Sequence, residues 1–487
     1  MPSFWLPLCI LFPLAAGAAL FALPDRSFRL LFGTTLAVTT VTSALVWAWI
    51  LWGGEAAIAL IRFAPELELL LKTDGLGRFF LGVLATLWPL TVLYAGSYMR
   101  DQQHVRSFFA FFTLAYCAAI GVAAAGNLFT LYCFYEFLTL STVPLILQPM
   151  TSAARKAARE YFLYSIGGSA FAFVAMLYLL AHGASGPFTP GGILRGEVFG
   201  GEGIARLFWL FGFLGFSVKA ALFPLHRWLI KASVAPTPVT ALLHAVAVVK
   251  SGAFAVIRLT QYCYGTELLA DSWAQTAALL LAAFTVVYGS SLAVRETHFK
   301  RRLAYSTVAN LSYILFGAML MTPAGLAAAL LHIAAHACIK IVSFFCAGAV
   351  LHESGRESVF ELDGIGRRMP VTFACFTVSA FALMGLPPLN GFVSKWYLLA
   401  AAAESGGVAW IGAGALLLSA LLTAIYMLTA ARRAWFPDRD ADLASLAAVH
   451  EADWKMLVPM VLLTLGMLLC GVFGEPILRA VQAAIGL

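Results

Sequence analysis

Long apolar runs separated by short polar connectors fill most of this chain. We predict that they form about fourteen helices, at residues 4–23, 30–52, 78–99, 107–125, 127–147, 161–182, 206–229, 237–257, 272–294, 303–321, 325–351, 371–402, 407–430 and 456–473. A helix of about 20 apolar residues crosses the hydrocarbon core of a bilayer. The pattern therefore predicts an all-α, polytopic membrane protein.

Composition supports this interpretation and excludes a soluble enzyme. Of the 487 residues, 61% are hydrophobic and 11% are charged, and the mean hydropathy is +0.88. Soluble domains carry about a quarter charged residues. The net charge of +7 is typical of a membrane protein with basic cytoplasmic loops, so we expect no nucleic-acid partner.

The basic residues also predict the topology. Connectors that follow odd-numbered helices hold 20 of the 31 Lys and Arg, whereas the other connectors and the C-terminal tail hold 7. Short loops rich in Lys and Arg stay in the cytoplasm. We therefore expect an integral protein of a bacterial inner membrane with both termini on the periplasmic side. The run Phe4 to Leu23 has no basic segment before it, so we interpret it as a permanent helix rather than a signal peptide.

The remaining four basic residues all lie within predicted spans, and all are lysines: Lys219, Lys250, Lys340 and Lys395. Only one acidic residue, Glu136, lies well inside a span. Each such charge costs roughly 2.5–3.5 kcal/mol at the bilayer centre, so intramembrane charges usually mark an ion pathway.

Prolines interrupt the seventh and twelfth runs, each close to one of these lysines. Pro224 follows Lys219, whereas Pro387, Pro388 and Gly391 precede Lys395. Broken helices five spans apart predict two inverted five-helix repeats, helices 4–8 and 9–13. The expected division is therefore 1–105 for helices 1–3, 106–258 and 259–430 for the repeats, and 431–487 for the last loop and helix.

Two sets of polar residues suggest proton transfer. Glu136 and Lys219 could form a pair that holds or releases a proton as their separation changes. A structural ion pair or a neutral, protonated carboxyl is the alternative. Lys250 and His244 lie about 120° apart on one predicted helix and could flank a polar channel. Lys250 could instead extend its ammonium to the membrane surface.

His332, His336 and Lys340 follow one another at intervals of four residues, so they form one stripe on a helix. Such a stripe could seat a chain of waters, and two packing histidines are the simpler alternative. Zinc is disfavoured because a lysine follows and no carboxylate or cysteine joins the histidines. The eight cysteines are scattered singly, and the sequence contains no glycine fingerprint for a nucleotide. We expect no metal, no cofactor and no redox centre.

These motifs together resemble the antiporter-like membrane subunits of the complex I superfamily. The resemblance rests on Glu136 in Tyr-Glu-Phe, Lys219-Ala-Ala-Leu-Phe-Pro-Leu-His, the segment from Ala235 to Lys250, His332-x3-His336-x3-Lys340, and the segment from Gly385 to Lys395. It implies a proton relay through Glu136, Lys219, Lys250, His244, His332, His336, Lys340 and Lys395. Some relatives carry glutamate at the last position.

The resemblance implies a proton-translocating subunit that depends on other membrane subunits, in an assembly related to NADH:quinone oxidoreductase or to energy-converting hydrogenases. Any redox chemistry would belong to a partner. An Mrp-type subunit that exchanges sodium for protons shares every motif and is one alternative. A membrane scaffold without ion conduction is the other, and it requires the buried charges to be structural.

Overall fold

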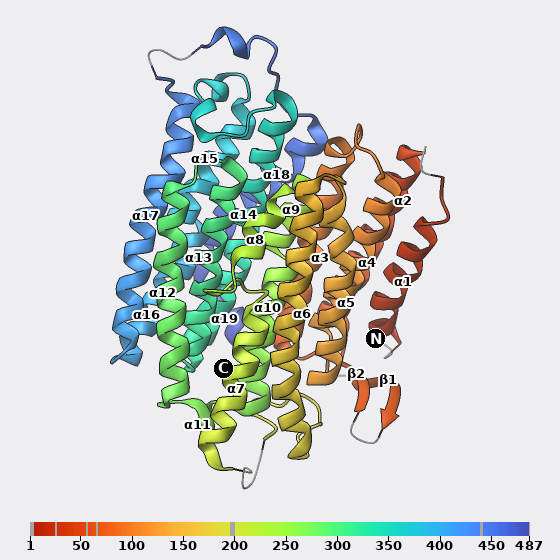
Figure 1. Ribbon diagram of the computed structural model, residues 1–487, viewed down its shortest axis with the longest axis vertical. Coiled ribbons are helices and arrows are strands. Elements are labelled where there is room, and N and C mark those ends of the chain that lie inside the picture. Colours follow the sequence, from red (N-terminus) through yellow and green to blue (C-terminus); the bar gives the residue numbers. More distant parts are fainter. Residues whose placement is uncertain are drawn as a thin grey trace.

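The protein is described by a computed structural model that covers residues 4–24, 27–54, 57–64, 67–194, 200–438 and 442–486. Most of these residues form helices that run along one common direction (Figure 1). The first helices are α1 (Trp5–Leu20), α2 (Phe28–Trp52), α3 (Gly75–Tyr98), α4 (Val105–Ala123), α5 (Leu128–Leu147), α6 (Ser152–Ala181), α7 (Gly201–Ser217), α8 (Arg227–Lys231), α9 (Thr237–Ala245) and α10 (Val248–Ile257). The later helices are α11 (Thr266–Leu269), α12 (Trp273–Arg295), α13 (Phe299–Met319), α14 (Pro323–Ser354), α15 (Pro370–Met384), α16 (Asn390–Ser405), α17 (Ala409–Trp435), α18 (Trp454–Val472) and α19 (Gly474–Ala484).

Short helices of other types connect these elements. They are the 3-10 turns η1 (Ala232–Val234), η3 (Val359–Glu361), η4 (Ile365–Arg367) and η5 (Ala444–Leu446), and the π-helix η2 (Arg258–Tyr264). Within the described residues, ten helical segments are long and apolar enough to cross a membrane. The prediction of a mostly helical, polytopic membrane protein is therefore confirmed.

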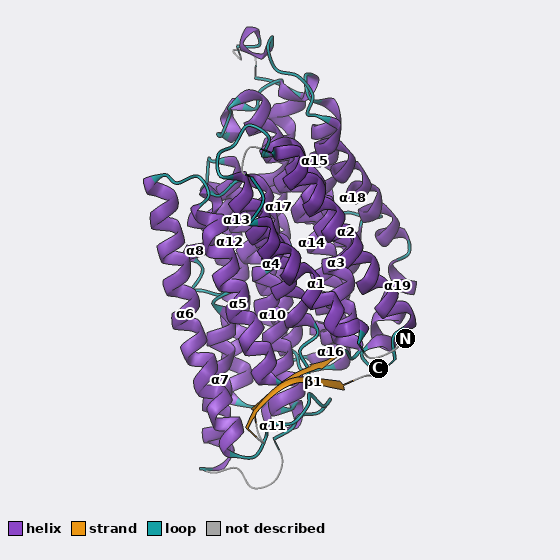
Figure 2. Cartoon of the chain, turned by 90° about the vertical axis from the view of Figure 1, so that its right-hand side faces the viewer, coloured by secondary structure: helices purple, strands orange, loops and turns teal. Residues whose placement is uncertain are grey.

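One part of the chain is not helical, and the sequence analysis missed it. Strands β1 (Ala57–Ala64) and β2 (Leu67–Lys72) form an antiparallel hairpin beside one end of the bundle (Figure 2). Strand β2 is held there by the chain that follows α4, since the Lys72 amide donates to the Ala124 carbonyl at 2.9 Å and the Gly126 amide donates to the Leu70 carbonyl at 2.8 Å. The predicted helices left these residues unassigned, because these tertiary backbone contacts leave no local signature in the sequence.

Two helices are interrupted where the prolines lie. Helix α7 ends at Ser217 and helical structure resumes at Arg227, so Pro224 lies in the gap. The carbonyl of Val218 accepts from the Ala221 amide at 3.0 Å and from the indole of Trp228 at 2.8 Å, so a side chain of α8 binds the backbone of the gap. Between α15 and α16, the gap contains Pro387 and Pro388.

Gly391 does not belong to the second gap, which corrects the prediction. It lies in the first turn of α16, where its backbone approaches the carbonyl of Ala382 so closely that an added Cβ would lie 1.8 Å from that oxygen. Glycine is required here for close packing of two backbones.

A third interruption divides the predicted helix at 237–257, so the prediction of a continuous helix there is wrong. Helix α9 ends at Ala245 and α10 begins at Val248, and Val246 leaves the helical region with φ −134°. Two candidate spans, Thr237–Tyr264 and α14, are the most buried. In the most apolar 18-residue stretch of each, 100% and 89% of the residues are buried. They lie near the middle of the bundle, with α3 to α6 on one side and α12, α16 and α17 on the other (Figure 1).

Candidate functional site

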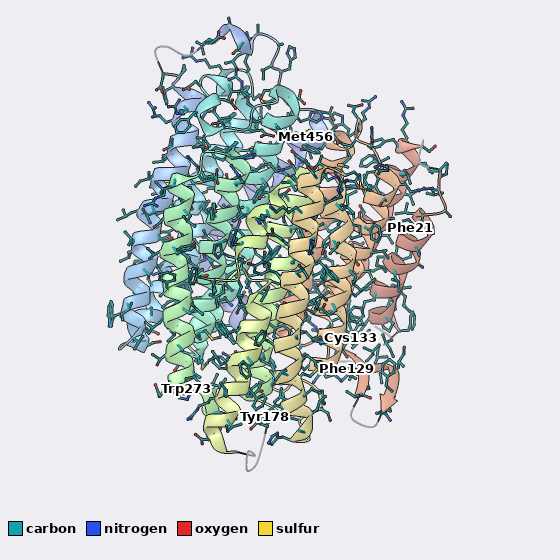
Figure 3. The ribbon with its side chains drawn as sticks, in the orientation of Figure 1. Phe21, Phe129, Cys133, Tyr178, Trp273 and Met456 are labelled. Carbon is teal, nitrogen blue, oxygen red and sulfur yellow. The ribbon has the colours of Figure 1, made fainter. Side chains whose placement is uncertain are left out.

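Seven of the eight predicted relay residues are buried, and Glu136 is half-buried. The buried ones are Lys219, His244, Lys250, His332, His336, Lys340 and Lys395, of which Lys395 is the most exposed at 7%. Most of the other buried side chains are apolar, and the rest are mainly Ser and Thr; Figure 3 draws the side chains on the ribbon. Because buried ammonium groups are costly in such surroundings, each must have polar partners.

Glu136 and Lys219 lie on either side of Tyr135. The Glu136 carboxylate accepts a hydrogen bond from the Ser169 hydroxyl of α6, and the Lys219 ammonium donates to the carbonyl of Tyr135 at 2.5 Å. The same ammonium lies 3.3 Å from the centre of the Tyr135 ring. Within the described residues no ion pair joins Glu136 to Lys219, so the two charges can interact only over a longer distance.

Lys250 sits directly after the gap between α9 and α10. Its ammonium contacts Nδ1 of His336 on α14 at 2.7 Å and donates to the carbonyl of His244 at 3.3 Å. That carbonyl is free because the helix stops one residue later. The gap therefore binds the lysine through its backbone.

The imidazole of His244 lies apart from this contact. Its ring packs 4.8 Å from the ring of Phe344, and neither ring nitrogen has a hydrogen-bond partner among the described residues. The 120° separation predicted for His244 and Lys250 assumed a continuous helix and does not apply. His244 contacts Lys250 through its carbonyl only.

The stripe on α14 is formed as predicted. The rings of His332 and His336 stack with 5.9 Å between their centres, and Nδ1 of His332 shares a hydrogen bond of 3.0 Å with the hydroxyl of Ser394 on α16. One turn beyond His336, the Lys340 ammonium donates to the Leu303 carbonyl at 2.7 Å and to the Ser306 hydroxyl at 2.5 Å. The stripe thus connects α13, α10 and α16.

Lys395 lies at the second proline gap, where it ends a row of buried bases that also contains Lys340, His336 and His332. Its ammonium donates to the carbonyls of Leu383 and Met384, at 2.5 Å and 3.4 Å, which are the last two residues of α15. It also lies 5.1 Å from the centre of the Tyr313 ring, which stacks on His332 at 5.2 Å. A lysine at the C-terminal end of a helix is favoured by the helix dipole and by the free carbonyls there.

Sequence reasoning missed the groups that bind the side chains of Glu136, Lys219, His332 and Lys340. Tyr135, Ser169, Ser306 and Ser394 carry no sequence signal that separates them from other polar residues in helices. Lys300 was missed for another reason, because it belongs to a basic run that we interpreted as a topological anchor. Its ammonium is buried and donates to the carbonyl of Ala235 at 2.9 Å.

Several buried polar atoms beside the row lack a partner in the described residues. They are Nε2 of His332, Nε2 of His336, Oγ of Ser251, Oδ1 of Asn310 and Oγ of Ser312. Buried polar groups are nearly always hydrogen-bonded to protein or to water. Among the described residues no three His, Cys, Asp or Glu side chains gather as a metal site would require.

Comparison with known proteins identifies a family. Residues 125–423 match the family described as NADH:quinone oxidoreductase/Mrp antiporter, TM. Subunit N of NADH-quinone oxidoreductase from Desulforudis audaxviator is 32% identical over 86% of this chain and 84% of that protein. Subunit L from Mycobacterium tuberculosis is 30% identical over 82% of this chain, and this chain spans 62% of its length.

Solved structures share the fold. One chain in the Mrp complex from Dietzia sp. DQ12-45-1b has a TM-score of 0.85 at 20% identity and covers all of this chain and 97% of its own. A chain of respiratory complex I from Thermus thermophilus has a TM-score of 0.83 at 23% identity over 99% of this chain and 98% of its own. The match over 299 consecutive residues and the similarity to subunit N show that this chain belongs to the NADH:quinone oxidoreductase/Mrp antiporter transmembrane family.

Proposed function

We propose that this chain is a proton-translocating, antiporter-like subunit of a multisubunit membrane complex related to NADH:quinone oxidoreductase or to hydrogenases. Its partners would be other membrane subunits, and any redox chemistry would lie in them. Family membership and the similarity to subunits N and L support this role.

One observation carries the proposal: a row of buried bases crosses the centre of the bundle with few acids beside it. Lys340, His336, His332 and Lys395 follow one another, and Lys250 joins the row at His336. Lys219 lies close to the same row because its backbone packs against α10 at Gly252, where an added side chain would clash. Bases at such spacing, with unpartnered polar atoms between them, suit proton transfer through bound water.

In the proposed path a proton enters at Lys219 and Glu136, crosses through Lys250, His336 and His332, and leaves at Lys395. The His244 carbonyl holds Lys250 in position, and Lys340 holds the stripe on α14 against α13. Lysine and histidine suit this task because both can gain and lose a proton, whereas arginine cannot.

We further propose fourteen spans, with α7–α8, α9–α10 and α15–α16 each crossing as one interrupted span. Corresponding gaps with a lysine beside each, five spans apart, support inverted repeats at helices 4–8 and 9–13. The basic connectors support a bacterial inner membrane with both termini on the periplasmic side. Cysteine labelling at Ser358 and at Gly407 tests the topology, because only the first should be reached from the cytoplasm.

A cation antiporter subunit is the second candidate. A relative from Rhizobium meliloti, described as a probable K(+)/H(+) antiporter component, is 32% identical over 71% of this chain, which spans 34% of that protein. The fold is also shared with the Mrp complex. Both candidates use the same proton path, so the ion dependence of transport separates them.

The test uses the intact complex purified with its partners and reconstituted in liposomes that contain a pH-sensitive dye. Proton uptake should require the redox reaction of the partners, and it should be lost in Lys219→Ala with assembly unchanged. Uptake that follows a sodium or potassium gradient without redox turnover would favour the antiporter instead. Full uptake in Lys219→Ala would favour a structural role for the buried charges.

A further inference from the structure

A cavity of about 700 Å³ opens at the end of the bundle where α6 and α8 begin, outside the row of buried bases. It lies between α6, α8, the start of α13 and the connector after α14. Five of its lining residues are cationic: Lys156, Arg227, Lys231, Lys300 and Arg301. Only two are acidic, Glu296 and Glu357. The cavity therefore has an excess of positive charge.

Three of these cations have no acidic partner. Lys231 pairs with Glu160, and Arg301 pairs with Glu296 at 3.2 Å. Within the described residues, Lys156, Arg227 and Lys300 form no ion pair, and Lys300 donates only to a backbone carbonyl. An anion in the cavity would meet three cations that form no ion pair within the described residues, of which Lys300 has Glu357 as its acidic neighbour.

Two buried side chains that line the cavity also lack partners. His226 and Ser233 are each 5% exposed, and neither Nδ1 of His226 nor Oγ of Ser233 has a hydrogen-bond partner among the described residues. A buried polar atom without a partner costs about 1–3 kcal/mol. Both atoms could donate to an oxyanion, and so they point to a ligand with phosphate-like oxygens.

An apolar groove of about 530 Å³ lies next to this cavity on the outer surface of α6 and α7. Leu163, Phe171 and Leu214 line it, and Leu163 and Phe171 are more than half exposed. Gly167 lies in its floor, where an added Cβ would meet nothing within 4 Å. The groove is wide enough for an alkyl chain and offers that chain no polar contact.

The groove and the cavity lie next to each other along two segments, helix α6 and the chain that leads into α8. Leu225 lines the groove and the next residue, His226, lines the cavity. On α6, Ala157 lines the cavity and Tyr164 lines the groove. These two residues share one helix face, about 10 Å apart at 1.5 Å per residue.

We propose that the cavity and the groove together bind one anionic phospholipid. The phosphate contacts Lys156, Arg227 and Lys300 and accepts hydrogen bonds from His226 and Ser233, while an acyl chain lies in the groove over Gly167. A soluble phosphate would use the cavity alone and leave the groove unexplained. The lipid belongs to the leaflet at this end of the bundle, which is the cytoplasmic leaflet in the proposed topology.

The experiment is native mass spectrometry of the full-length chain in detergent, titrated with palmitoyl-oleoyl phosphatidylglycerol or with phosphatidylcholine of the same chains. Lys156→Gln and Arg227→Gln should each weaken phosphatidylglycerol binding about fivefold, because one cation near an anionic lipid contributes about that factor. Arg155→Gln is the matched control, since Arg155 lies in the same turn of α6, does not line the cavity and donates to the Met150 carbonyl at 3.1 Å.

Gly167→Leu tests the groove and should weaken phosphatidylglycerol binding at least fivefold. Gly414→Leu on α17 is its control, since Gly414 also faces open space. Thermal unfolding of both variants must match that of the wild type, as expected for a leucine in an open helical position. The proposal also requires that glycerol 3-phosphate and inorganic phosphate compete poorly.

Three results would overturn the proposal. Equal binding of phosphatidylcholine would remove the role of charge, and equal loss in Arg155→Gln would show a diffuse surface effect. Unchanged binding in Gly167→Leu, with strong competition by inorganic phosphate, would show a soluble anion site. None of these results depends on proton transport, so the lipid site and the proposed function can fail independently.

Discussion

The ammonium of Lys250 and the imidazole of His336 contact each other at 2.7 Å across α10 and α14. Two bases at this distance share one proton, because two adjacent cations would repel each other in a medium of low dielectric. The contact exists because α9 stops at Ala245, so that the backbone turns and the His244 carbonyl receives the same ammonium. The proposed path passes through this pair.

Replacing either member should therefore interrupt the path at that point. We expect His336→Leu and Lys250→Met each to lower coupled proton uptake at least tenfold, and the double variant to be no worse than either single variant. The measurement is dye-detected proton uptake by the reconstituted complex. His352→Leu is the control, since His352 lies on the same helix near the surface beside Glu353. Additive losses would mean that the two residues act separately.

Glu136 should act through its charge, although it makes no ion pair with Lys219. We expect Glu136→Gln to assemble normally and to lose most proton uptake, because the amide keeps the shape and a hydrogen bond to Ser169 but not the charge. Ser169→Ala should lose a much smaller part of proton uptake. Uptake by each variant is compared with that of Glu404→Gln, an exposed acid at the end of α16. Full activity of Glu136→Gln would contradict a role for the carboxylate.

Sequence could predict the parts of this site that local chemistry controls. Proline has no amide hydrogen, so Pro224 and Pro387 mark the two gaps, and a spacing of four residues places His332 and His336 on one helix face. A lysine within an apolar run is conspicuous wherever it lies. These features depend only on neighbouring residues.

The rest depends on contacts between distant segments. The gap at Val246 contains neither proline nor glycine. It is stabilised by the Lys250 side chain, whose ammonium donates to the His244 carbonyl. The acceptor of Lys219 is a carbonyl on α5, which carries no side-chain signal. The hairpin at β1 and β2 likewise depends on backbone bonds to residues after α4. Such partners can be found only in the folded chain.

An ion pair outside the path, between a buried arginine and a half-buried aspartate, gives a prediction about stability. Asp74 caps α3 and pairs with Arg258 of the π-helix η2 through two bonds, at 2.5 Å and 2.6 Å. Burial alone would raise the pKa of Asp74, but the Arg258 guanidinium and the Gly77 amide hold it below its usual value. Asp74→Asn leaves a fully buried guanidinium unpaired, so we expect a loss of about 3 kcal/mol in the free energy of unfolding.

The pH dependence of this effect has a definite sign. A carboxylate whose pKa is lowered by folding contributes its full stabilisation above its unfolded pKa of about 3.9 and loses it as the pH falls through the folded value. The difference in thermal unfolding between wild type and Asp74→Asn should stay constant from pH 8 to pH 5 and shrink below about pH 4. Glu68→Gln, which breaks the exposed pair with Arg62, should cost at most about 1 kcal/mol.

In the proposed path, a proton leaves the row through Lys395 at the second gap. Its ammonium lies against the last carbonyls of α15, and Gly385 lies so close that an added Cβ would be 3.1 Å from Cδ of the lysine. Lysine can release its proton there, whereas the guanidinium of Lys395→Arg remains charged. We therefore expect Lys395→Arg to assemble and to lose at least nine-tenths of proton uptake. Lys395→Glu should keep part of it, because a protonated carboxyl can still donate to one of those carbonyls.

The control for this prediction is Lys455→Arg, since the Lys455 ammonium lies near the rings of Phe32 and Trp454 and away from the row. Each variant is measured in liposomes that contain the intact complex, with and without sodium. Sodium would need several oxygen ligands and would be repelled by an ammonium at this point, so its removal should leave uptake unchanged. Wild-type uptake by Lys395→Arg would show that protons leave elsewhere, and uptake that stops without sodium would assign the row to cation exchange.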